Sequence, residues 1–404
     1  MKKGKQPQVA YFCMEYGLQS DFNIYAGGLG ILAGDYLKGA HDGDYPVVGI
    51  GILWKQGYTT QVIQPDGTPV DTYPIHRYDF LKDTGIKVKV EIRRRMVDCK
   101  VWKCDAFSNA ELYLLDTDLP ENEDPWITGQ LYGWFGEERI AQEMVLGIGG
   151  VRALRKLKKK IDVYHFNEGH ALFAGLELIR EKMDKGMNFR EAWEVSKKEI
   201  VFTTHTPVLQ GNESHPLDRL LYMGANLGLT KRQLRSMGGE PFNMTVGGLR
   251  LSRKSNAVAQ LHGETANEMW SDVTNRSEII AITNGIHRPT WVDLKMKNLV
   301  AGSDSSLWKR HQKNKSDLIG FIRKKTGILL DKDRLLIGFS RRAVPYKRSD
   351  LIFSDPAIIE PLLRKRRIQL VFSGKGHPLD DEGKAIVHRL TSMQKKYPRS
   401  VLFL

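Results

Sequence analysis

Short apolar runs that end in a polar turn and lead into a helical stretch limit the folds open to this chain. The clearest lie at residues 9–12, 161–166, 200–204 and 279–282. Strands that alternate with helices in this way form parallel sheets covered by helices. The sequence therefore predicts an α/β fold with a parallel sheet.

Polar side chains follow the last three of these runs, namely Asn167, Glu168, His170, His205 and Asn284. The carboxyl ends of parallel strands meet at one edge of a sheet, where α/β proteins bind ligands. Neutral hydrogen-bonding groups suit a hydroxyl-rich ligand, so we interpret these residues as a sugar site. The histidines are too far apart for a short metal-binding motif, and a single His or Glu at such a turn is more often structural.

A glycine-rich turn at residues 27–30 stands between the first apolar run and a helical stretch that ends near Gly43. Gly27 and Gly28 allow the backbone to approach a ligand closely, and the helix N-terminus behind them favours an anion. A plain tight turn explains the same residues, because their spacing is not the dinucleotide-binding fingerprint.

Residues 335–350, LLIGFSRRAVPYKRSD, combine an apolar run with four cations. The run predicts a buried strand, and a helix is expected to begin near Ser349 and Asp350, which are good N-cap residues. The cations between strand and helix then suit a phosphate group, and they are Arg341, Arg342, Lys347 and Arg348. The alternative is a solvated basic loop.

The length of 404 residues predicts two domains. We expect a first domain over residues 1–325, with a β-rich insertion at 56–102 and a long helix at 131–157 that Gly149 and Gly150 interrupt. Residues 326–404 would begin a second α/β domain with three strands and two helices. Because that is few for such a domain, we expect a chain truncated at its C-terminus.

Lys and Arg number 61 against 47 Asp and Glu, which gives a formal net charge of +14. This excess suits anionic small ligands, and no nucleic-acid-binding motif is present. The three cysteines make neither a metal-binding pattern nor a disulfide framework. With no apolar run long enough for a membrane helix and no secretory signal, we expect a soluble, cytoplasmic protein with no membrane partner.

Ten stretches, in order along the chain, resemble the α-glucan phosphorylases, the family of glycogen, starch and maltodextrin phosphorylases, particularly in its short prokaryotic form. They include AYFCMEYGL at 10–18, IYAGGLGILAGDYLKGAHD at 24–42, HFNEGHALF at 165–173, VFTTHTPVLQGN at 201–212, ITNGIHRPTW at 282–291, FSRRAVPYKR at 339–348 and FSGKGHP at 372–378. The resemblance implies a glycosyltransferase B fold, in which two Rossmann-like domains face each other across a cleft. The second domain would be incomplete here.

The same resemblance implies reversible phosphorolysis of terminal α-1,4 glucosidic bonds to glucose 1-phosphate, with retention. Gly27 and Gly28 would face the phosphate and the transferred glucose. His205 and Asn284 would hydrogen-bond the glucosyl unit. Glu168 and His170 match a motif near the sugar site.

Family members also use pyridoxal phosphate, whose phosphate group relays a proton to the substrate phosphate. Arg342 and Lys347 would bind these two phosphates. The family attaches the cofactor to a lysine in a motif like EASGTSNMK, and this sequence contains no such stretch. Lys347 and Lys375 belong to other motifs, so we expect no covalent attachment at the family position and little phosphorolysis by the 404-residue chain alone.

Two other functions fit parts of the sequence. A nucleotide-sugar glucosyltransferase of the glycogen synthase type shares the fold, a glycine turn and an Arg-x4-Lys pair. A non-catalytic glucan-binding fragment would explain the missing lysine. The strings HFNEGH, THTPV and TNGIHRPTW favour a phosphorylase, for which the family implies an α-1,4-glucan, phosphate and glucose 1-phosphate as ligands and a homodimer as the assembly.

Overall fold

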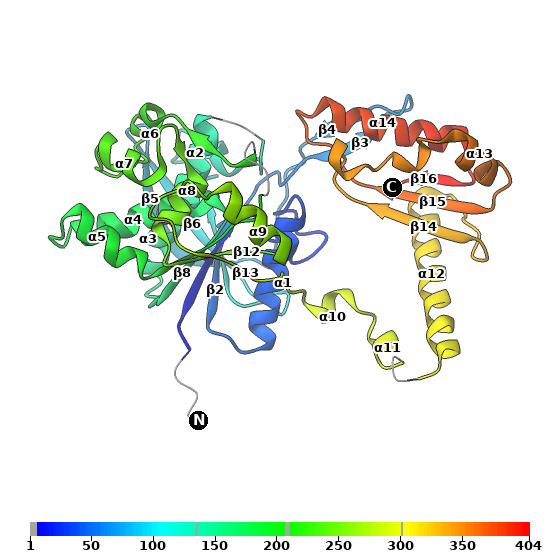
Figure 1. The fold of residues 1–404 in the computed structure, drawn as a ribbon, viewed down its shortest axis with the longest axis horizontal. Coiled ribbons are helices and arrows are strands. Elements are labelled where there is room, and N and C mark those ends of the chain that lie inside the picture. The colour runs from blue at the N-terminus through cyan, green and yellow to red at the C-terminus, as the bar shows by residue number, and fades with distance from the viewer. Residues whose placement is uncertain (1–5, 134–135, 207–210, 300–301) are drawn as a thin grey trace. The chain divides into compact units, whose positions relative to one another are not determined.

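The computed structural model describes residues 6–133, 136–206, 211–299 and 302–404, which separate into two compact units (Figure 1). Unit 1 comprises the residues up to Tyr58 together with Ile75–His287. Unit 2 comprises Thr59–Pro74 and Arg288–Leu404. The chain therefore leaves unit 1, returns to it and leaves it again. The boundary expected after residue 325 falls inside unit 2.

Unit 1 is built on a nine-stranded sheet. In spatial order the strands are β13 (Ile279–Ala281), β12 (Lys254–Ala257), β9 (Ile200–Thr203), β8 (Val163–Asn167), β1 (Val9–Phe12), β2 (Val47–Ile52), β7 (Leu112–Asp116), β6 (Arg95–Cys104) and β5 (Lys82–Ile92). The first seven pair in parallel, and β6 and β5 add an antiparallel edge. The predicted parallel α/β sheet is thus confirmed.

Helices connect the strands of unit 1 (Figure 1). They are α1 (Gly28–Asp42), α2 (Glu137–Met144), α3 (Gly150–Lys156), α4 (Leu172–Met183), α5 (Phe189–Lys197), α6 (Leu217–Met223), α7 (Lys231–Gly238), α8 (Met244–Leu251) and α9 (Gln260–Met269). Short helical turns η1 (Pro125–Thr128) and η3 (Gly169–Ala171) and a two-stranded ladder of β10 (Ser214–His215) and β11 (Phe242–Asn243) complete the unit.

The helix expected over residues 131–157 begins later, at Glu137, and runs through α2 and α3. The predicted interruption at Gly149 and Gly150 coincides with the end of a π-helical turn, η2 (Val145–Gly149), after which α3 begins at Gly150. Gly147 lets this turn pack closely on α4, because a Cβ there would lie 2.5 Å from the backbone nitrogen of Ala174. The glycines of this stretch therefore serve packing rather than helix termination.

The strand order of unit 1 reverses at β1. The chain passes from β1 through α1 to β2 on one side, whereas β8, β9, β12 and β13 are added on the other side. Open α/β sheets bind ligands beyond the carboxyl ends of their strands at such a reversal. We therefore expect a ligand-binding site at the turns after β1, β8 and β9.

Unit 2 has a three-stranded parallel sheet in the order β14 (Leu335–Ser340), β15 (Ile368–Ser373) and β16 (Val401–Phe403). Ile319 and Ile322 of α12 (Asp304–Thr326) pack with Val371 and Leu402 of the sheet. A second cluster joins the sheet to α13 (Pro356–Arg364) and α14 (Asp381–Lys396). The remaining elements are the β-hairpin of β3 (Thr60–Ile63) and β4 (Pro69–Thr72), α10 (Arg288–Trp291), α11 (Leu294–Lys297), η5 (Pro345–Lys347) and η6 (Leu351–Phe353).

Two expectations for residues 335–350 were wrong. The strand β14 is not buried, because it forms an edge of its sheet, and Leu335 and Ile337 are 61% and 38% exposed. Only a short helical turn, η6, follows Asp350, and the α-helix α13 begins later, at Pro356. A helix started at Ser349 would carry Pro356 in its interior, whereas proline suits the first helical position, where Asp355 caps the backbone N–H of Ala357 at 3.0 Å.

None of the helices among the described residues is both long enough and apolar enough to cross a membrane.

Candidate functional site

Glu168 lies at the carboxyl end of β8 and faces the turn that follows β9. Its carboxylate accepts hydrogen bonds from the backbone N–H of His205 at 2.5 Å and from the hydroxyl of Thr206 at 3.2 Å. The residue has a φ of +68°, which is unusual for a side chain larger than glycine and is typical of functional turns. Burial raises the pKa of Glu168. Glu168, the backbone N–H of His205 and the hydroxyl of Thr206 form one polar cluster.

His205 is held from a second side by Asn167. The Nε2 of His205 lies 2.6 Å from Oδ1 of Asn167, whose Nδ2 in turn donates to the sulfur of Cys13 at 3.1 Å. Burial lowers the pKa of His205 to about 4, so the ring is neutral at neutral pH. Because Oδ1 of Asn167 can only accept, Nε2 of His205 carries the proton and Nδ1 is the acceptor of the ring.

His170 is the third predicted residue of this edge. Burial, together with the nearby guanidinium of Arg139, lowers the pKa of His170 to about 3. Its Nδ1 is buried and has no hydrogen-bond partner among the residues that the structure describes. The ring lies 6.0 Å from that of Tyr132. A neutral imidazole with an unused nitrogen is suited to bind a polar ligand atom.

The glycine turn before α1 is shaped by Glu15, a residue that the sequence analysis did not single out. Oε2 of Glu15 accepts hydrogen bonds from the backbone N–H groups of Ala26 at 2.6 Å and Gly27 at 3.1 Å. Oε1 accepts the hydroxyl of Tyr132 at 2.9 Å. Among the described residues, nothing lies within 4 Å of a Cβ placed on Gly27 or Gly28. That part of the structure therefore leaves space above the turn.

Asn284 follows β13 at the same edge of the sheet, but β12 separates its strand from β9. The residue is exposed, and its backbone N–H donates to the carbonyl of Val258 at 3.1 Å. The structure thus groups Glu168 and His205 closely and leaves Asn284 further along the edge. Residues 207–210 of the THTPV stretch lie outside the described residues.

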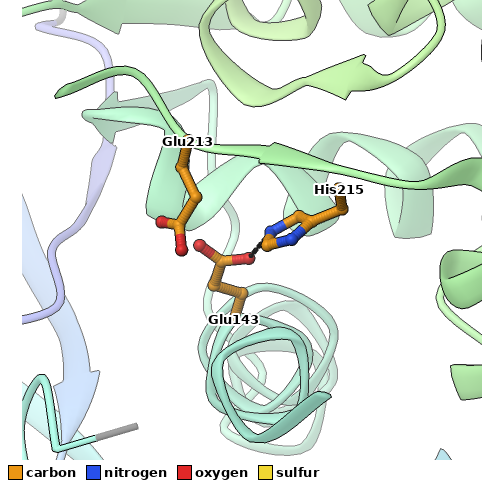
Figure 2. Close-up of side chains that lie close together, drawn as sticks. All are labelled: Glu143, Glu213 and His215. Carbon is orange, nitrogen blue, oxygen red and sulfur yellow. Dashed lines mark hydrogen bonds and ion pairs between the residues drawn. The ribbon is translucent and has the colours of Figure 1, made fainter. Parts of the chain in front are cut away.

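A buried charged cluster beside His170 was also missed. Figure 2 shows Glu143 of α2 pointing toward Glu213 and His215, whose ligand-type atoms lie within 4.8 Å of one another. Nε of Arg139 lies 3.0 and 3.1 Å from the two oxygens of Glu213, and Nε2 of His215 lies 2.9 Å from Oε2 of Glu143. Since a guanidinium already neutralises this group, we interpret it as a buried ion-pair network rather than a metal site.

The protonation of this network follows from burial and pairing. Burial raises the pKa of Glu143 to about 7. Burial alone would raise the pKa of Glu213, but Arg139 outweighs it and lowers that pKa to about 2. Burial likewise would lower the pKa of His215, but Glu143 raises it. Glu213 therefore stays ionised, whereas Glu143 titrates near neutral pH and is coupled to His215, whose pKa it raises.

In unit 2, the predicted phosphate-binding residues lie in the loop after β14. Arg341, Arg342 and Arg348 are exposed, and Lys347 is half-buried. Within the described part of the chain, no carboxylate lies within ion-pair distance of any of the four. Four cations without counter-charges in one short loop attract an anion. Arg342 and Lys347 are thus available for the predicted role.

The chain was compared with known proteins, and no family model matches it. It is 35% identical to maltodextrin phosphorylase of Thermococcus litoralis over 96% of this chain and 53% of that protein. It is 32% identical to glycogen phosphorylase of Aquifex aeolicus over 97% of this chain and 65% of that protein. A protein of uncharacterised function from Methanocaldococcus jannaschii is 37% identical over 92% of this chain and 70% of its own length.

The chain is thus similar over nearly its whole length to maltodextrin and glycogen phosphorylases. It spans about half the length of the maltodextrin phosphorylase that it matches.

Proposed function

We propose that the protein is an α-glucan phosphorylase that transfers a terminal α-1,4-linked glucosyl unit to phosphate, with retention, and releases glucose 1-phosphate. The match to maltodextrin and glycogen phosphorylases over nearly the whole chain carries this proposal. The neutral His205, the unused nitrogen of His170 and the open glycine turn support it, because a sugar requires neutral hydrogen-bonding groups.

The proposal assigns roles to residues of both units. His205, Asn284, Glu168 and His170 serve the glucosyl unit, the first two by hydrogen bonds to its hydroxyls. Gly27 and Gly28 place the N-terminus of α1 toward the phosphate and the glucose. We further propose that both units are Rossmann-like domains of the glycosyltransferase B type, with unit 2 as the first part of its domain.

Arg342 and Lys347 are proposed to gather the substrate phosphate and the phosphate of pyridoxal phosphate. The two cations offset the repulsion between these anions and stabilise charge that develops on the substrate phosphate. The unpaired cations after β14 fit the phosphate end of the cofactor. When bound, the cofactor supplies an acid–base group next to the substrate phosphate. The sequence has no lysine in a motif like EASGTSNMK, so we propose no covalent attachment through these residues.

The test is to incubate the protein with maltoheptaose, phosphate and pyridoxal phosphate and to measure glucose 1-phosphate. Parallel reactions contain ADP-glucose in place of phosphate and are examined for chain extension. Because the sequence lacks the cofactor-lysine motif, we expect little glucose 1-phosphate in the first reaction, and its loss in Arg342→Met supports the proposal. Chain extension only would identify a nucleotide-sugar glucosyltransferase. Binding of maltoheptaose without either product would identify a glucan-binding fragment.

We also propose a cytoplasmic homodimer, as in the family expectation. Sedimentation velocity measures the oligomeric state directly, and a monomer at micromolar concentration would contradict this part of the proposal.

A further inference from the structure

The hairpin of β3 and β4 belongs to unit 2, although its sequence lies between segments of unit 1. It lies against α14 and the turn before it (Figure 1). Nζ of Lys375 donates to the carbonyl of Thr59 at 2.7 Å, and the backbone N–H of Gly376 donates to Oε1 of Gln61 at 3.2 Å. The hydroxyl of Thr391 donates to the carbonyl of Gly67 at 2.9 Å. The hairpin is therefore fixed to the FSGKGHP stretch, which the proposed function leaves without a role.

The turn that the hairpin contacts also holds the loop that carries Arg342. The backbone N–H of Arg341 donates to the carbonyl of Ser373 at 3.1 Å, and that of Ala343 donates to the carbonyl of Lys375 at 2.9 Å. Backbone hydrogen bonds thus hold the chain on both sides of Arg342. The contact is close, because a Cβ on Gly374 would lie 1.9 Å from the carbonyl oxygen of Arg341. Movement of the turn would therefore move Arg342.

Asp71 is the residue that holds the hairpin together. Its carboxylate accepts the hydroxyl of Thr59 at 2.7 Å and Nε2 of Gln61 at 3.1 Å, and it lies 2.8 Å from Nζ of Lys384. The side chain of Asp71 is only 10% exposed. Thr59 and Gln61 are the two residues that contact the turn at 375–376. One carboxylate thus orients both contacts and ties the hairpin to α14.

We propose that Asp71 is a positioning residue for the anion-binding loop after β14. It acts through the hairpin and the turn at residues 373–377 and does not touch the anion. The identity of the anion as phosphate rests on the proposed function, whereas the mechanical link from Asp71 to Arg342 does not.

Asp71→Asn gives a test in which the loss of charge and the loss of positioning should change the Kd for phosphate in opposite directions. The substitution keeps the shape of the side chain but removes a negative charge from unit 2, so electrostatics alone would tighten the binding of an anion. If Asp71 positions the loop, the Kd for inorganic phosphate instead rises about three- to tenfold, as is usual when a preorganised site loses its support. Isothermal titration calorimetry on the 404-residue protein measures it.

Asp317→Asn is the matched control, since Asp317 lies on α12 and, among the described residues, its one ion pair is with Lys313 at 2.9 Å. It makes the same charge change and should leave the Kd unchanged or slightly lower. Gln61→Ala removes the contact to Gly376 without a charge change and should weaken binding in the same direction as Asp71→Asn. Gln61→Ala also tests the inference if the Asp71→Asn protein does not fold.

Hydrogen exchange of the amides at residues 341–344 and 346–348 provides a readout that needs no ligand. We expect faster exchange in Asp71→Asn and Gln61→Ala than in the wild type. Unchanged exchange, or a Kd in Asp71→Asn equal to or below that of the wild type, would overturn the inference. If wild type and Arg342→Met bind phosphate equally, or neither binds it, the proposed anion site fails and the exchange experiment still decides the role of Asp71.

Discussion

Asn167 and Glu168 hold His205 through its ring and through its backbone, respectively. A side chain held at two points loses little further freedom when it binds a ligand, which favours affinity and orientation. Burial keeps its imidazole neutral, so it can both donate and accept hydrogen bonds. A neutral, fixed imidazole suits the role proposed for His205, a polar contact to the glucosyl unit, better than that of a cation for phosphate.

This assignment predicts the effect of Asn167→Asp. A carboxylate 2.6 Å from Nε2 of His205 would favour the imidazolium, so the pKa of His205 should rise from about 4 by roughly one to three units. NMR titration of the histidine rings measures the shift. The pKa of His165, which burial also lowers to about 4, serves as an internal control, because Nε2 of His165 bonds to Thr203. An unchanged pKa of His205 would contradict the tautomer assigned above.

The buried pair of Glu143 and His215 predicts how stability varies with pH. Both pKa values are raised in the folded protein, so the folded state holds protons that the unfolded chain has released. Stability from these groups is present at low pH and is lost as the pH rises through their folded values, about 7 for Glu143.

Glu143→Gln should therefore reduce the loss of unfolding free energy between pH 5 and pH 8, by on the order of 1–3 kcal/mol. Urea denaturation at several pH values measures it. An equally steep loss in wild type and variant would show that Glu143 does not titrate in this range.

At the scale of elements, the exposed edge of β14 has a consequence for association. An edge strand presents unpaired backbone groups, and Leu335 and Ile337 add apolar surface next to them. Ile337→Lys should lower self-association at high protein concentration while changing the stability of unit 2 by less than about 0.5 kcal/mol. Dynamic light scattering measures the first effect and urea denaturation the second. Leu370→Lys, in the buried neighbour β15, should instead unfold the unit.

The close approach of the turn after β15 to the loop after β14 predicts a second result. Gly374→Ala forces a Cβ to within 1.9 Å of a backbone oxygen, which cannot move aside as a side chain would. We expect a loss of about 2–4 kcal/mol in the stability of unit 2, as for other backbone clashes. Gly338→Ala in β14 is the control, because a Cβ there meets nothing within 4 Å. Equal stability of the two variants in thermal denaturation would refute the contact.

The success of the sequence predictions depended on how local their causes are. The runs at residues 9–12 and 200–204 became strands because short apolar segments between turn residues need no distant information. The burial of β14 was wrong because burial depends on which neighbours a sheet has. The helix start was wrong because Pro356 suits the first position of an α-helix, so the residues after Asp350 form only the short turn η6.

The same distinction applies to the candidate site. His205 and Glu168 were found because they directly follow strands. Glu15 also follows a strand closely, so the same rule could have identified it. Its partner Tyr132 is 117 residues away in the sequence, and no local pattern predicts such a contact. Asp71 was missed for the same reason, since Lys384 comes from a distant segment.

At the scale of the whole molecule, unit 2 is built from two separate segments of the chain, so a change in one segment should destabilise the other. Replacing residues 60–72 with a Gly-Ser linker removes contacts that belong to unit 2. Amide exchange in α14 should then accelerate about tenfold or more, whereas α4 in unit 1 should keep its protection. Hydrogen exchange followed by mass spectrometry measures both helices in one experiment. Equal loss of protection in α4 and α14 would contradict the division into two units.

The placement of the hairpin also sets an order of events during biosynthesis. Thr59 and Lys375 are 316 residues apart in the chain. At a ribosomal rate of about 5–20 residues per second, the hairpin waits about 15–60 s for its partner to be made. During that time unit 1 can fold around the two ends of the hairpin, while the hairpin itself stays without its binding surface. The nascent protein thus carries a β-hairpin without its packing surface until the turn before α14 leaves the ribosome.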